Sequence, residues 1–123
     1  MKYKLVVKGE IAHSAHYLKH YVGKCAGLHG HSYVIEACVS GDKLVNGMLI
    51  DSTYIKKYLN DIVSEIDHNL INDALKMEDA TAENIAAYIF GKLSERLLPH
   101  KNIKLDWIRV HETEDMYAEV SKE

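Results

Sequence analysis

The chain has 123 residues, of which 47% are hydrophobic and 27% charged. This length predicts one domain over residues 1–123, and this balance excludes a mainly disordered protein. No apolar run approaches the ~20 residues of a membrane-spanning helix. A net charge of −3 argues against a nucleic-acid-binding protein. Two cysteines are too few for a disulfide framework, which favours the cytoplasm.

A strand is predicted over residues 2–12, where apolar and charged side chains alternate. One face of this strand would carry Tyr3, Leu5, Val7 and Ile11. Residues 13–30, rich in histidine, glycine and tyrosine, predict an irregular segment. A second strand is predicted from about His31 to Ser40, and the two strands are close enough to pair antiparallel.

Two helices are predicted in the middle of the chain, over residues 52–66 and 82–98, from apolar side chains at helical spacing. Asp51 or Ser52 can cap the first helix and Thr81 the second. The polar stretch 67–80 between the helices predicts a loop. Two further strands are predicted over residues 103–112 and 116–121, joined by a short link.

The predicted element order is β-β-α-α-β-β. It indicates an α+β fold in which a four-stranded antiparallel sheet carries two helices on one face. An open sheet leaves edge strands that must be covered or paired, so association of subunits through their sheets is expected.

Histidine is the unusual residue, with eight in the chain and five of them from His13 to His31. His29 and His31 flank Gly30, and on an extended backbone their side chains point the same way. His16 would lie beside them if the first two strands pair. Three imidazoles with an open fourth position are typical of a catalytic zinc site. The alternative is a chance pair in a histidine-rich loop.

Three other features could carry acid–base chemistry. Cys25, four residues before His29, could be a general base, a fourth zinc ligand or a plain loop residue. Asp67 could fix the tautomer of His68 for proton transfer, or the two could form a solvated helix end. Glu112 could bind a ring with adjacent N–H donors, or it could be exposed.

Six segments, taken together and in chain order, resemble the 6-pyruvoyltetrahydropterin synthase family, which includes the queuosine-pathway 6-carboxytetrahydropterin synthases. They are AHSAHYL (12–18), CAGLHGHSY (25–33), GMLID (47–51), DHNLIND (67–73), TAENIAAYIF (81–90) and VHET (110–113). The resemblance implies a tunnelling fold, in which sheets join three subunits into a barrel and two trimers stack into a homohexamer. It also implies active sites between subunits.

The resemblance further implies a role for each candidate residue. Cys25 would be the base that takes a proton from the substrate side chain, and Asp67 with His68 would form a second proton-transfer pair. Glu112 would bind the 2-amino-4-oxo edge of a pterin, in a pocket also lined by Thr81. The implied ligands of Zn²⁺ are His16, His29 and His31.

The implied substrate is 7,8-dihydroneopterin triphosphate, a small molecule that zinc would activate as a Lewis acid. Three residues separate Cys25 from His29, which resembles the 6-carboxytetrahydropterin branch, where the products include acetaldehyde and triphosphate. The alternatives are the 6-pyruvoyl branch, another dihydroneopterin-processing branch and a zinc- or pterin-binding module without activity. Ala12 and Tyr17, where the family usually has an aromatic residue and often an arginine, bear on substrate preference.

Overall fold

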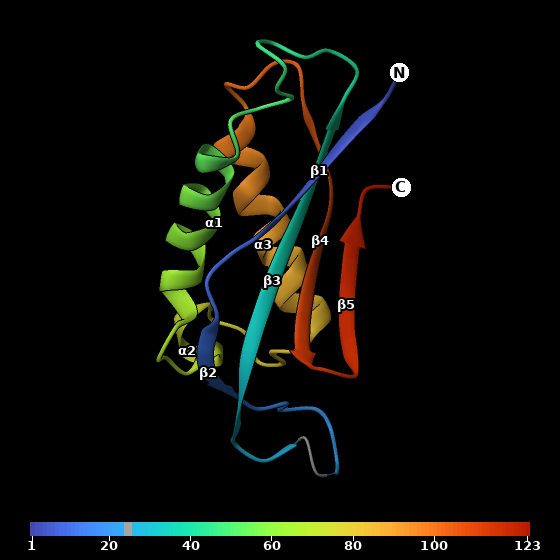
Figure 1. Cartoon of the computed structure of the whole chain (residues 1–123). Coiled ribbons are helices and arrows are strands. Elements are labelled where there is room, and N and C mark those ends of the chain that lie inside the picture. Colours follow the sequence, from blue (N-terminus) through green and yellow to red (C-terminus); the bar gives the residue numbers. More distant parts are fainter. Residues whose placement is uncertain (24–25) are drawn as a thin grey trace.

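The computed structural model describes residues 1–23 and 26–123, and its five strands form one antiparallel sheet (Figure 1). The order across the sheet is β1-β3-β4-β5, and β2 pairs with the first part of β3. None of the helices in the described part of the chain is long and apolar enough to cross a membrane. The strands are β1 (Tyr3–Lys8), β2 (Ala12–His16), β3 (His29–Gly41), β4 (Lys104–Thr113) and β5 (Met116–Ser121).

The two long helices, α1 (Ser52–Ile66) and α3 (Ala82–Leu97), lie together over one face of the sheet (Figure 1). Each begins at a side-chain cap: Asp51 accepts from the Thr53 N–H at 3.0 Å and Thr81 from the Asn84 N–H at 3.1 Å. The α+β prediction with two helices on one face is confirmed. α1 buries a stripe against the core made of Ile55, Leu59, Ile62, Val63 and Ile66.

The predicted strand 2–12 is in fact two strands with a change of phase between them. Lys8 pairs with Glu36 and Ala12 with Tyr33, so three residues on this edge oppose two on β3. One surplus residue turns the strand over, because side chains alternate with a period of two. The inward positions therefore change from odd numbers to even ones. The prediction that Ile11 shares the face of Val7 is wrong, since Ile11 is half exposed.

The predicted irregular segment 13–30 is also wrong at both ends, because β2 continues to His16 and β3 begins at His29. The predicted loop 67–80 contains a short helix, α2 (Ile71–Ala74). Ile71 is fully buried there, which anchors this turn to the core. The other elements match their predicted bounds within two residues.

Candidate metal centre

Four side chains converge where β2 ends, β3 begins and β4 ends. One ligand atom from each lies within 4.8 Å of those of the other three. The four residues are His16, His29, His31 and Glu112. In Figure 1 these strand ends lie on the same side of the molecule as α2.

Strand pairing brings the three histidines together. His16 is the direct antiparallel partner of His29, and their ring centroids are 4.3 Å apart. The phase change before β2 turns His16 toward the inner face, where it is 2% exposed. Gly30 separates His29 from His31, and a Cβ there would lie 3.3 Å from the Ser14 carbonyl oxygen. A side chain at position 30 would therefore crowd β2.

A bulge aims Glu112 at the same point. His111 pairs with Tyr117 and Thr113 with Met116, which leaves Glu112 as the surplus residue of β4. Bulges of this kind redirect a side chain beside a functional site. The Glu112 Oε1 atom lies 2.9 Å from the Nε2 atom of His31 and 3.3 Å from that of His16.

Backbone carbonyls set the tautomers of two of the rings. The Nδ1 atom of His16 lies 2.6 Å from the Ala80 carbonyl oxygen, and that of His29 lies 2.7 Å from the Gly27 carbonyl oxygen. Because a carbonyl can only accept, each Nδ1 carries its hydrogen and donates it. The lone pair of each neutral ring is then on Nε2, as in histidines that bind metals through that atom.

The donor set fits a divalent metal ion. The Nε2 atoms of His16 and His29 are 2.9 Å apart, and in these tautomers both are acceptors. Two acceptors this close repel each other unless a cation lies between them. The Nε2 atom of His31 is buried and has no hydrogen-bond partner among the described residues. The Glu112 Oε1 atom is only 2.9 Å from this nitrogen, but the angles of the contact are not those of a hydrogen bond. A metal ion would satisfy all of these atoms at once.

The surroundings favour the uncharged state of His31. Burial has the largest effect and lowers its pKa; Glu112 raises the pKa, and His16 and His29 lower it again. A neutral imidazole is the form that binds a metal. Tyr33 packs edge-on against His16 and His31, with centroid distances of 5.7 and 5.6 Å. Burial and the charge of Glu112 raise the pKa of Tyr33, so its phenol stays protonated.

Asn72 is a supporting residue that the sequence reasoning missed. Its amide is 3% exposed and joins the chain just after His16 to the segment that precedes α3. Its Oδ1 accepts from the Tyr17 N–H at 2.9 Å, and its Nδ2 donates to the carbonyls of Tyr17 and Glu78 at 2.9 and 3.0 Å. The one signal in the sequence was a polar residue directly after the apolar Ile71.

Replacing Asn72 with leucine, which has a similar volume, is expected to lower the free energy of unfolding by about 3 kcal/mol, because buried backbone groups lose their partners. Metal affinity should also fall by about tenfold, since the backbone beside His16 loosens. Denaturant unfolding of the metal-free protein and a chelator competition measure the two effects. Asn69→Leu is the control, because the exposed side chain of Asn69 donates a single hydrogen bond among the described residues, to the Glu65 carbonyl. Equal unfolding curves for the two variants would contradict this interpretation.

Asp67 and His68 form a pair beside the cluster. The Asp67 Oδ1 atom lies 3.0 Å from the His68 Nδ1 atom and accepts from the His13 N–H at 2.9 Å. That N–H is the main reason why the pKa of Asp67 is below its usual range. His68 packs beside His13, which points to the face of β2 opposite to His16. His31 and His68 nevertheless border one open cavity of about 650 Å³.

Two predicted site residues remain, Cys25 and Thr81. Cys25 lies outside the described residues. Thr81 caps α3 and directly follows Ala80, whose carbonyl accepts from His16. The structure thus brings three predicted zinc ligands together with Glu112, and places Thr81 behind one of them.

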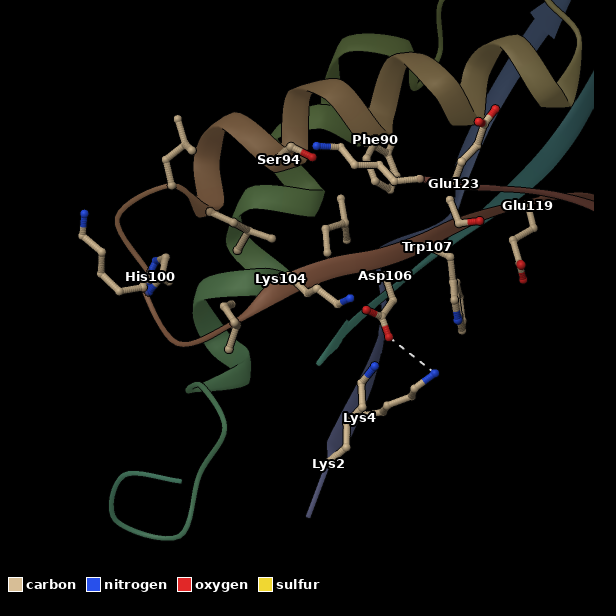
Figure 2. Close-up of a pocket in the computed structure, with 17 residues that line it drawn as sticks. Lys2, Lys4, Phe90, Ser94, His100, Lys104, Asp106, Trp107, Glu119 and Glu123 are labelled. Carbon is tan, nitrogen blue, oxygen red and sulfur yellow. Dashed lines mark ion pairs between the residues drawn. The ribbon is translucent and has the colours of Figure 1, made fainter. Parts of the chain in front are cut away.

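Figure 2 shows a different hollow, of about 780 Å³, at the opposite end of the sheet. Several lysines border it, and one of them, Lys4, forms an ion pair with Asp106 at 3.4 Å. Phe90 and Trp107 contribute apolar surface. The hollow holds none of the predicted site residues, so the chemistry of the side chains rather than cavity size identifies the metal centre.

Comparison with known proteins agrees with this geometry. The family model described as 6-pyruvoyl tetrahydropterin synthase matches residues 6–123. The 6-carboxy-5,6,7,8-tetrahydropterin synthase of Synechocystis sp. is 41% identical over 92 residues, covering 70% of this chain and 71% of that protein. The 6-pyruvoyl tetrahydrobiopterin synthase of Dictyostelium discoideum is 32% identical over 101 residues, covering 78% and 72%.

A solved structure shares the fold. The 6-pyruvoyl tetrahydropterin synthase of Caenorhabditis elegans matches 100% of this chain and 96% of its own, with a TM-score of 0.80 and 24% identity. The strand and helix arrangement seen in Figure 1 is therefore the tunnelling fold.

Proposed function

Because the chain belongs to the 6-pyruvoyl tetrahydropterin synthase family, we propose that it is a zinc-dependent lyase of the 6-carboxytetrahydropterin branch. Its substrates are 7,8-dihydroneopterin triphosphate and water, and its products are 6-carboxy-5,6,7,8-tetrahydropterin, acetaldehyde and triphosphate. The reaction serves queuosine and 7-deazaguanine biosynthesis. The observation that carries the proposal is the convergence of one ligand atom each from His16, His29 and His31, with the Nε2 atoms of His16 and His29 2.9 Å apart.

The residues divide the work of this reaction. Bound zinc supplies a Lewis acid that makes the neighbouring C–H and O–H groups of the substrate more acidic. Asp67 holds His68 through Nδ1, which leaves the Nε2 atom of this exposed ring to take or deliver a proton. Cys25 takes a proton from the substrate side chain. Glu112 binds the 2-amino-4-oxo edge of the pterin, and Thr81 lines that pocket.

The proposed enzyme is a cytoplasmic homohexamer built from two trimers. β1 and β5 support this assembly, because each pairs with one strand only in the described structure. Their free edges can hydrogen-bond to the sheet of a neighbouring subunit.

Product analysis tests the proposed reaction. Zinc-loaded protein incubated with 7,8-dihydroneopterin triphosphate should release acetaldehyde and a 6-carboxypterin in equal amounts. Release of triphosphate without acetaldehyde would contradict C–C cleavage and assign the protein to the 6-pyruvoyl branch. The likeness to the Dictyostelium discoideum protein makes that branch the second candidate. Zinc binding with no turnover would instead indicate a binding module.

A further inference from the structure

We propose that Glu112 is the fourth metal ligand of the substrate-free protein and that the arriving pterin draws it away from the metal. The inference rests on the proposed function, and it adds a step that precedes the chemistry. Glu112 then has two successive partners, the metal and the pterin ring.

The position of the carboxylate supports the first partner. Its Oε1 atom lies within 3.3 Å of the Nε2 atoms of both His16 and His31. A carboxylate oxygen among three imidazole nitrogens completes the four-coordinate shell that zinc prefers. In the substrate-free protein the metal is therefore closed to other ligands.

The charge of Glu112 points the same way. Its side chain is 14% exposed, and among the described residues its ion-pair contacts are the two imidazoles alone. A carboxylate with so little exposure is, in proteins, usually paired with a cation or coordinated to a metal ion. A divalent ion between the four groups supplies the missing positive charge.

The second partner requires the same atoms. A carboxylate that accepts from two adjacent N–H groups of a pterin uses both oxygens in one plane. The Oε1 atom cannot face the metal and a ring N–H in that arrangement, so the two states alternate. The bulge assists the exchange, because Glu112 is the surplus residue of β4 and has no partner opposite it on β5.

Because of this exchange, only a molecule that carries the pterin ring edge gains access to the metal. A molecule with the 2-amino-4-oxo edge competes for Glu112 and frees the fourth position for its own side-chain hydroxyls. A simple diol offers hydroxyls without N–H donors, so Glu112 stays on the metal. The protein thus selects pterins over simple diols at the binding step, before any bond of the substrate is broken.

Cobalt-substituted protein provides the test, because Co²⁺ absorption reports the coordination shell. We compare the unaltered protein with Glu112→Gln and with the matched control Glu114→Gln, an exposed carboxylate two residues away. Glu112→Gln should weaken Zn²⁺ and Co²⁺ binding in a chelator competition by at least about tenfold, the lower end for loss of an outer-shell partner. Its Co²⁺ spectrum should change, and that of Glu114→Gln should not.

Neopterin, which has the ring edge and hydroxyls but no triphosphate, tests the release of Glu112. It should shift the Co²⁺ spectrum of the unaltered protein, and 1,2-propanediol should not. Unchanged affinity and spectrum in Glu112→Gln would overturn the ligand assignment, and an unshifted spectrum with neopterin would overturn the release. Thermal melts of the metal-free variants show whether they fold. Acetaldehyde production by the unaltered protein separately decides the proposed function.

Discussion

Replacing His31 with alanine is expected to strip the metal from the protein and to abolish turnover of 7,8-dihydroneopterin triphosphate. The variant loses a ligand whose buried Nε2 atom has no hydrogen-bond partner among the described residues, so the substitution removes no hydrogen bond of that atom. We expect the turnover rate to fall by more than about 100-fold. Loss of a residue that only supports a metal ligand costs up to about 100-fold, and loss of the ligand itself should cost more. Metal content after dialysis and acetaldehyde production measure the two losses.

His100→Ala is the control for this variant. His100 lies far from the cluster and exchanges a hydrogen bond with the Tyr58 hydroxyl at 2.9 Å. This control should retain both metal and turnover. Full metal content in His31→Ala would contradict the assignment of this ring as a ligand.

Replacing Asp67 with asparagine is expected to lower kcat by about 10²- to 10⁴-fold, the usual contribution of a positioned acid–base group. Asparagine can still accept the His13 N–H, which preserves the local backbone. It cannot stabilise a protonated His68, because the amide carries no charge. Zinc content should not change, since Asp67 is not among the converging ligand atoms.

The matched control is Asp73→Asn, an exposed carboxylate in the same segment. It should turn over like the unaltered protein. A normal kcat in Asp67→Asn would show that the pair is only a solvated helix end. A parallel loss of zinc would instead assign Asp67 to the support of the metal centre.

Local signals in the sequence predicted the features that depend on nearby residues. Asp51 and Thr81 are good caps because each side chain reaches backbone N–H groups two or three residues ahead. His29 and His31 point the same way because strand geometry repeats every two residues. The two long helices and the strand pairs follow from the same kind of periodicity.

Features that depend on register or on distant partners could not be predicted. The surplus residue before Ala12 exists only relative to β3, and the bulge at Glu112 only relative to β5. Alternation alone therefore placed Ile11 on the wrong face. Asn72 bonds to Tyr17, 55 positions away, and no periodic pattern reports such a contact.

The short segment between β1 and β2 has a consequence for how this gene can change. Glu10 and Ile11 are exposed, so their identities are open to substitution. The number of residues in the segment cannot change in the same way. Deletion of one residue would turn β2 over, so that its inward and outward side chains exchange faces. His16 would then face outward and His13 inward, and the metal would lose a ligand although every histidine codon is intact. Insertion or deletion of a single codon is thus more damaging here than most substitutions.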